Sequence, residues 1–319
     1  RALAGPHAGM MLGDMGARVI KIESPTGDDS RGWGPPFLGE GDERESTYFM
    51  SANRNKESLV LDLKTDADRD VLARLVERAD VLMENFRVGV LDRLGFSVAR
   101  LHELNPRLIV LSITGFGHDG PEAARSGYDQ IAQGEGGLMS ITGTDQPTKV
   151  GVPIADLIAG MYGAYGVLAA LHERERTGRG RVVRTSLLAG MVGVHAYQGT
   201  RWTVGGEVPG LAGDHHPSIS PYGMFATATA PVQIACGSEG LWQALCGAFG
   251  WDAAEAEFAT NALRVANRPA LTARMEELFA TKPAEQKPAE TLAELEAKVA
   301  AYETEKQVSA WKAEVSKDT

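Results

Sequence analysis

The chain has 319 residues, 43% hydrophobic and 23% charged, an ordinary composition for a globular protein with room for two domains. Its formal net charge of -10 argues against nucleic acid and an anionic membrane surface as partners. Two cysteines, Cys236 and Cys246, are too few for a disulfide framework or a metal cluster, so we expect a reducing, cytoplasmic setting. We find no apolar window of membrane-spanning length and no signal peptide, and because Arg1 opens inside a motif we expect the natural chain to begin further upstream.

The first 190 residues alternate expected strands and helices. The segments rich in β-branched and apolar residues that predict strands are 18–23, 58–63, 80–84, 108–113 and 181–186. Helices are predicted after Thr65, which has the side chain of an N-cap, over 89–104, and from Asp156 onward. This rhythm is typical of the α/β class, and it predicts a Rossmann-like large domain at 1–190 with a mostly parallel sheet.

The composition changes beyond residue 190. Gly, Pro, Thr and His crowd the stretch 199–221, which predicts a long connection, and we place a linker at 191–221. Two short strands near 223–227 and 232–236 and a helix at 241–249 predict a smaller α+β domain at 222–282. Apolar residues at helical spacing between Glu and Lys predict a charged amphipathic helical tail at 283–319.

One motif matches the sequence pattern of a dinucleotide-binding site. The segment 115–120 follows a strand and fits the pattern G-x-G-x-x-G. Such a site needs a helix to start there, so that its N-terminus can hold the pyrophosphate, but Pro121 follows and no apolar helical stripe continues. We therefore predict a glycine-rich turn rather than a nicotinamide site.

Asp156 is the most informative residue. It follows Pro153 at the predicted start of a helix with small residues at spacing four, which would let another backbone come close. A carboxylate at a helix N-terminus is stabilised by the macrodipole, so we expect Asp156 to stay ionised and to be a candidate covalent nucleophile. An N-cap is the alternative, because Asp is a favoured capping residue.

Motifs spread along the chain carry a family resemblance. In order they are 3–6 (LAGP), 12–23, 53–64, 79–86, 91–95, 105–106, 114–117, 127–129, 177–181 and 216–217. With these motifs the chain resembles the family III coenzyme A transferases, the group of formyl-CoA transferase and carnitine CoA-transferase, from Arg1 to about Gly250.

The resemblance implies both a site and an assembly. Asp156 takes the place of the family's nucleophile, and Tyr128 and Asp129 are expected to lie next to Asp156 and support it. The residues matching those that hold CoA are Ala2, Leu3, Leu61, Lys64, Asn85, Phe86, Arg93 and Leu94. The family also implies an interlocked homodimer. Taken one by one, these residues would otherwise be ordinary solvated charges and core residues.

The implied chemistry is CoA transfer from an acyl-CoA thioester to a free carboxylic acid through an aspartyl anhydride and an aspartyl-CoA thioester. We expect no metal and no permanently bound cofactor, with coenzyme A present as substrate. Two alternatives stay open. One is a 2-methylacyl-CoA racemase, although Tyr128 stands where racemases have His, and a phenol, protonated at neutral pH, is a poor proton shuttle. The other is a non-catalytic acyl-CoA-binding homologue, which the lack of the family's usual return to the large domain after Phe279 favours.

Overall fold

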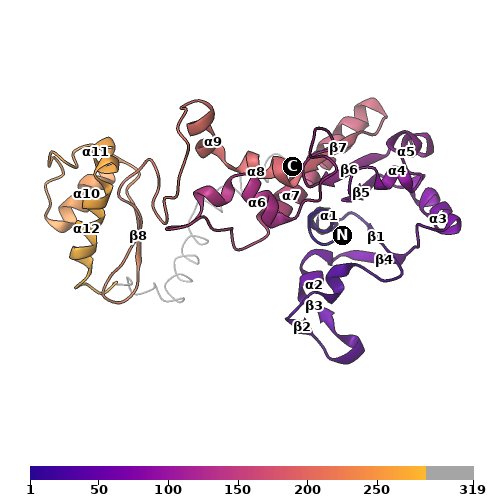
Figure 1. Ribbon diagram of the computed structural model, residues 1–319, viewed down its shortest axis with the longest axis horizontal. Coiled ribbons are helices and arrows are strands. Elements are labelled where there is room, and N and C mark those ends of the chain that lie inside the picture. Colours follow the sequence, from indigo (N-terminus) through magenta and orange to yellow (C-terminus); the bar gives the residue numbers. More distant parts are fainter. Residues whose placement is uncertain (285–319) are drawn as a thin grey trace, which may run out of the picture. The chain divides into compact units, whose positions relative to one another are not determined.

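A computed structural model describes residues 1–284, and the chain divides after Gly213 into two compact units (Figure 1). The division falls inside the predicted linker 191–221. The long connection predicted over 199–221 is wrong for residues 199–203, because α9 (Ala196–Thr203), which follows α8 (Leu187–Val194), extends to residue 203. In α9 the Arg201 guanidinium donates to Gln198 one turn earlier, a pairing that supports a helix of otherwise weak propensity. From residue 285 the predicted helical tail lies outside the described residues.

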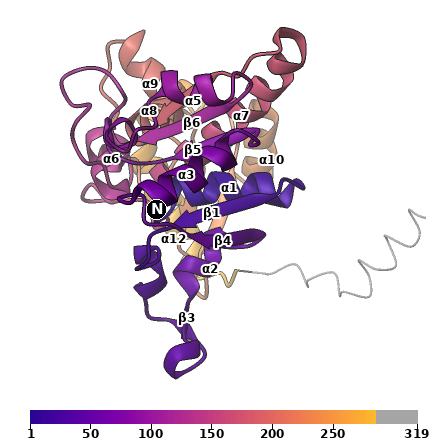
Figure 2. The same ribbon diagram turned by 90° about the vertical axis from the view of Figure 1, so that its right-hand side faces the viewer.

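Five parallel strands form the framework of the first unit. β1 (Val19–Glu23) pairs with β4 (Lys56–Val60), and β6 (Ile109–Thr114) lies between β5 (Val81–Glu84) and β7 (Val182–Ser186). Figure 1 shows these two sheets one after the other, in the order β7, β6, β5, β1, β4, and Figure 2 shows β6, β5, β1 and β4 in the same order. The predicted α/β class with parallel strands is confirmed, and each predicted strand lies within three residues of an observed one. The short antiparallel pair β2 (Phe37–Leu38) and β3 (Glu45–Ser46) lies in the connection after β1.

Helices connect these strands. They are α1 (Ala4–Asp14), α2 (Thr47–Asn53), α3 (Asp66–Val76), α4 (Val90–Arg93), α5 (Val98–Leu104), α6 (Asp129–Glu135) and α7 (Ile154–Thr177), with 3-10 turns at Asp29–Gly32, Gly41–Glu43 and Leu138–Ile141. Thr65 caps α3 as predicted, accepting from the Asp68 amide. The single helix predicted over 89–104 is wrong, because Gly95 adopts φ +88° and Ser97 caps a new helix, α5.

The small residues of α7 allow close packing, as the sequence predicted. A Cβ added at Gly160 would lie 2.7 Å from the Ala4 carbonyl oxygen in α1, and one at Gly163 would lie 3.0 Å from the Leu111 side chain in β6. Helix α7 is thereby held between α1 and the sheet, with Ala155, Ala159 and neighbouring residues in the main core. This packing fixes the N-terminal turn of α7, which carries Asp156, against the start of α1.

Helix α7 also has the length and composition of a membrane span, so the prediction that no such window exists is wrong. An 18-residue window within it has a mean hydropathy of 1.6. One such helix is weak support for membrane insertion, since a core helix packed on a sheet has the same composition. The Ile, Leu and Val residues of α7 supply most of this hydropathy, and its Ala and Gly residues line the close contacts with α1 and the sheet.

The second unit contains the predicted α+β elements. β8 (Tyr222–Phe225) pairs antiparallel with β9 (Val232–Ala235), and α10 (Glu239–Phe249) follows, matching the predicted strands and helix. Two further helices, α11 (Asn261–Ala266) and α12 (Arg268–Phe279), were not predicted. Phe225, Trp242 and Met275 are central to its core.

The glycine-rich segment after β6 is a turn, as predicted. No helix begins between β6 and α6 in this described segment, and Gly117 and Gly120 adopt positive φ values of 104° and 92°. Gly115 and Gly127 approach each other so closely that a Cβ on Gly115 would lie 2.5 Å from the Gly127 Cα. The glycines thus serve a tight chain reversal.

Candidate functional site

Asp156 is the third residue of α7, and Pro153 occupies the N-cap position. The capping is done by another residue: Oδ1 of Asp129, at the start of α6, accepts from the amides of Ala155 at 2.7 Å and Asp156 at 3.4 Å. The N-cap interpretation of Asp156 is therefore wrong, because Asp129 supplies the cap. The Asp156 carboxyl group is left available for other chemistry.

The surroundings of the Asp156 carboxyl raise its pKa to about 6. Burial is the largest cause, and the negative charge of Asp129 adds to it, while a hydrogen bond from the Ala4 amide at the start of α1 acts in the opposite direction. The helix dipole was expected to keep Asp156 ionised, and burial and Asp129 oppose that effect. At pH 7 a group with this pKa is still roughly nine-tenths ionised. Asp156 thus combines a usable carboxylate with weaker solvation than a surface Asp has.

Asp129 and Tyr128 contribute differently. The Asp129 side chain also accepts from Gln133, which is buried and in turn accepts from the Val150 amide, so the loop before α7 is tied to α6. Tyr128 is 71% exposed. The geometry supports Asp129 as the residue that positions Asp156, and it gives Tyr128 no comparable contact in the described chain.

A cleft of about 550 Å³ opens beside this helix start. Its wall is largely apolar and comes from the starts of α1 and α7, from the segment after β1 and from α2; the residues are Leu3, His7, Met10, Trp33, Gly34, Pro35, Pro36, Thr47, Tyr48, Ser51, Val152, Pro153 and Leu157. Burial raises the pKa of the Tyr48 phenol, and the charges of Asp156 and Asp129 raise it further. The cleft is therefore within electrostatic reach of Asp156, and its apolar wall can exclude water from it.

The predicted CoA-binding residues lie at the carboxyl ends of β4 and β5 and around α4 and the start of α1. Leu61 and Leu94 pack in one apolar cluster, whereas Lys64 and Arg93 are exposed.

The remaining predicted residues lie at the end of β5 and at the start of α1. Asn85 donates to the Arg1 carbonyl at 2.9 Å, which joins the end of β5 to the residues before α1. The Phe86 amide donates to Glu84, and Leu3 lines the cleft. Ala2 adopts φ +54°. The structure places these residues along the strand ends where open α/β sheets bind ligands.

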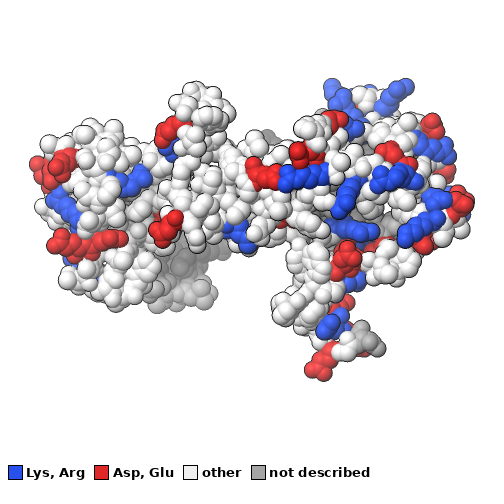
Figure 3. Space-filling model, in the orientation of Figure 1, with Lys and Arg blue, Asp and Glu red and all other residues white. Residues whose placement is uncertain are grey.

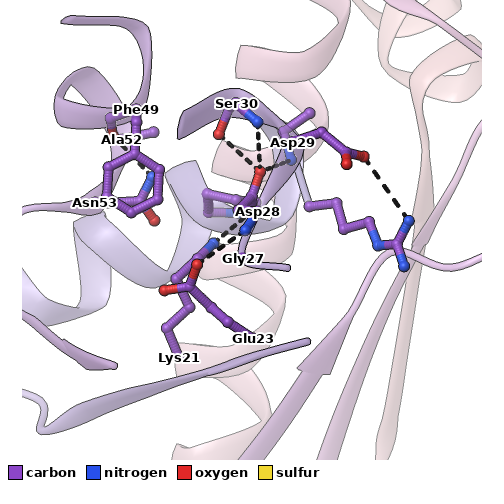
Figure 4. Close-up of polar contacts among 12 residues, drawn as sticks. Lys21, Glu23, Gly27, Asp28, Asp29, Ser30, Phe49, Ala52 and Asn53 are labelled. Atoms are coloured by element: carbon purple, nitrogen blue, oxygen red, sulfur yellow. Dashed lines mark hydrogen bonds and ion pairs between the residues drawn. The ribbon is translucent and has the colours of Figure 1, made fainter. Parts of the chain in front are cut away.

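Sequence reasoning missed a largely buried polar cluster made of Lys21, Glu23, Asp28 and Ser30 (Figure 4), with the exposed Arg31 paired to Glu23. Asp28 accepts from Lys21 Nζ at 2.7 Å, from the Ser30 amide and hydroxyl, and from the Ala2 amide at 3.4 Å. Burial opposes its ionisation, but the hydrogen bonds from Lys21 and Ser30 outweigh it and hold the pKa of Asp28 well below its usual range. The alternation of Lys21 and Glu23 with apolar residues in β1 was the available signal, because residues two apart share one face.

Comparison with known proteins identifies the family. The model of CoA-transferase family III matches residues 1–316. The chain belongs to CoA-transferase family III. The predicted family and the prediction of a CoA-transferase enzyme are thereby confirmed.

Relatives of this CoA-transferase agree with the assignment. It is 44% identical to succinate–glutarate CoA-transferase of Agrobacterium fabrum, over 84% of this chain and 69% of the relative. It is 43% identical to succinyl-CoA:mesaconate CoA-transferase of Haloarcula marismortui, over 87% and 72%. A crystal structure of a CaiB/BaiF family protein from Brucella suis superposes with a TM-score of 0.79 at 44% identity, covering 94% of this chain and 79% of the other.

Proposed function

We propose that this CoA-transferase works through Asp156 as a covalent nucleophile, moving CoA from an acyl-CoA thioester to a carboxylic acid. The observation that supports it best is the Asp156 carboxyl group, which is released from capping by Asp129 and held beside the cleft at the meeting of two helix N-termini. A weakly solvated, ionised carboxylate in that place is a better nucleophile than a surface one.

The donor acyl-CoA, the Asp156 carboxylate and the acceptor acid are the only reactants that the proposed steps need. An Asp156 oxygen attacks the thioester carbonyl carbon, the C–S bond breaks, and CoA leaves as thiolate, giving an acyl-aspartyl anhydride. The thiolate attacks the Asp156 carbonyl and the donor acid leaves, giving an aspartyl-CoA thioester. The acceptor carboxylate then repeats the steps in reverse. Each addition forms an oxyanion, and the Ala4 amide at the start of α1 is positioned to donate to an oxygen on Asp156.

The acids are proposed to be small dicarboxylates. The two relatives compared above are named for succinate, glutarate and mesaconate, and acetyl-CoA:oxalate CoA-transferase of Acetobacter aceti is 41% identical over 88% of this chain and 73% of the relative. CoA itself is proposed to lie along the strand ends, with Lys64 and Arg93 as phosphate contacts, because both cations are exposed there. It acts as substrate rather than as a permanent cofactor.

The interlocked homodimer stays a prediction, based on the family and on the stretch without helix or strand from Val204 to Pro221. Sedimentation over a dilution series tests it, and a monomer at micromolar concentration would argue against it. Racemisation is less well supported, since the relatives compared are named as transferases and Tyr128 is largely exposed. A purely binding role is opposed by the intact setting of Asp156.

The covalent intermediate gives the direct test. Incubation with an acyl-CoA followed by hydroxylamine should convert the activated carboxyl group to a hydroxamate, adding one mass label to the peptide that contains Asp156. A control without acyl-CoA should stay unlabelled. Label on another carboxylate, or full turnover without any label, would rule out Asp156 as the nucleophile.

The pH dependence of transfer should follow Asp156 and respond to Asp129. Since Asp156 must be ionised and its pKa is raised to about 6, activity should fall as the pH drops through that value. Asp129→Asn removes a nearby negative charge but keeps an oxygen that can accept from the Ala155 amide, so the acidic limb of the kcat/KM profile should move to lower pH. Asp119→Asn, an exposed carboxylate after β6, serves as the control. A profile that moves to higher pH in Asp129→Asn would contradict the assigned coupling.

A further inference from the structure

Apart from the Trp33 indole, the wall of the cleft contains four polar side chains, and two of these already have hydrogen-bond partners. The Thr47 hydroxyl donates to the Pro36 carbonyl at 3.0 Å, and the Ser51 hydroxyl donates to the Tyr48 carbonyl at 2.7 Å. The His7 imidazole and the Tyr48 hydroxyl make no hydrogen bond within the described part of the chain, and both are half-buried. A ligand in this cleft would therefore find the imidazole of His7 and the hydroxyl of Tyr48 free on a largely apolar wall.

His7 lies one helical turn from Asp156 along the same contact between α1 and α7. At the start of this contact the Ala4 amide donates to Asp156, and four residues further along α7 a Cβ added at Gly160 would lie 3.2 Å from His7 Cδ2. Four residues of helix rise by about 6 Å. A dicarboxylic acid of five carbons spans about 5 Å between its two carboxyl carbons, at roughly 1.3 Å per bond along its chain, which is close to this rise.

The charges around His7 suit an anion. The Lys56 ammonium, which donates to the Pro6 carbonyl at 2.7 Å, and the Arg54 guanidinium both lie near it, with Asp14 as the opposing charge on Arg54. Burial lowers the pKa of His7, and Lys56 and Arg54 lower it further, which favours the neutral ring with its single N–H donor. A neutral N–H donor can bind a carboxylate, and a carboxylate beside Lys56, whose pKa burial lowers to about 7, would favour the charged ammonium.

We propose that His7 binds the distal carboxylate of a dicarboxylic acid whose other carboxylate reacts at Asp156, and so selects dicarboxylates over monocarboxylates. This inference rests on the proposed function. Leu157 lines the cleft between the two ends, with Pro153 beside Asp156, and this apolar wall accommodates the methylene groups. A monocarboxylate of equal length would leave the His7 donor unpaired on a desolvated wall, which is the kind of penalty that produces strong discrimination.

The test compares glutarate with valerate as acceptors at one saturating acyl-CoA concentration, in wild type, His7→Phe and His7→Gln. Phe keeps the ring shape without a donor, and Gln keeps a donor. The ratio of kcat/KM for glutarate to that for valerate should fall about tenfold to a hundredfold in His7→Phe, through KM for glutarate, and partly recover in His7→Gln. Ser51→Ala, which changes a hydroxyl on the same wall that already has a partner, should keep the wild-type ratio.

The outcomes separate the two proposals. An unchanged ratio in His7→Phe, or an equal loss for both acids with no recovery in His7→Gln, would overturn the role of His7 while leaving transfer through Asp156 intact. If wild type gave no CoA transfer to either acid and no label at Asp156, the proposed function itself would fail, and this inference with it. Melting temperatures of the variants show whether a lost ratio comes from a lost fold.

Discussion

Asp156→Asn should lower CoA transfer by about a thousandfold or more, because an amide cannot form the anhydride and the side chain otherwise keeps its shape. The fold should survive, since Asp129 rather than Asp156 caps α7. Above pH 6 the Asp156→Asn variant should even be more stable than wild type. A carboxyl group whose pKa is raised to about 6 on folding costs the folded state free energy when it ionises, and the asparagine removes that cost. The measurements are the rate of acyl exchange and the melting temperature at pH 8.

Two controls make this result interpretable. Asparagine can deamidate to aspartate, so intact-mass analysis must exclude a small active fraction before any residual rate is assigned to the variant. Asp129→Asn is the matched substitution one contact away, and it should shift the pH profile without abolishing transfer. Asn at 156 with near-normal turnover would refute the nucleophile, whereas a lower melting temperature at pH 8 would refute the assigned electrostatics.

The framework could be predicted from the sequence because each signal was local. Strand 108–113 is apolar at every position except Ser112, and β6 is buried along its whole length. Thr65 capped its helix because a threonine before an apolar stripe needs no distant partner. The break at Gly95 was missed, since the apolar spacing runs on across a glycine whose positive φ only the folded chain reveals.

The site was predictable only in part, because its contacts join residues that are far apart in the sequence. Asp156 stood out through its position before a helix of small residues, but its capping partner Asp129 is 27 residues away and its hydrogen-bond donor Ala4 is further still. Such contacts depend on how α1, α6 and α7 pack, and the linear pattern does not show this packing. His7 was missed likewise, because a lone histidine in a helix gains significance only from the cleft that it lines.

Asp28→Ala should destabilise the first unit by about 3–5 kcal/mol, the usual cost of removing one partner of a buried ion pair. The Asp28 side chain is 4% exposed and that of its partner Lys21 12%, so the ammonium would be left desolvated without its carboxylate (Figure 4). The Ala2 amide and both Ser30 donors lose an acceptor as well. Because Ala2 leads into α1, whose first amide donates to Asp156, the loss should also reduce transfer.

Asp29→Ala is the matched control for this prediction. Its carboxylate is the neighbour in sequence, 69% exposed and 3.8 Å from the Arg1 guanidinium, so its loss should cost less than about 0.5 kcal/mol. Urea unfolding followed by circular dichroism measures the stability of both variants.

The contribution of Asp28 should depend on pH. The pKa of Asp28 is held well below its usual range, so the stability that Asp28 gives the fold is complete at neutral pH. It is lost as the pH falls below about 4, where the unfolded chain takes up protons first. The stability gap between wild type and Asp28→Ala should therefore narrow in acid. If the difference in unfolding free energy between wild type and Asp28→Ala stays constant from pH 7 to pH 3, Asp28 contributes by packing and not by charge. If the Asp28 and Asp29 variants are equally stable at pH 7, the buried pair stabilises the fold no more than an exposed one does.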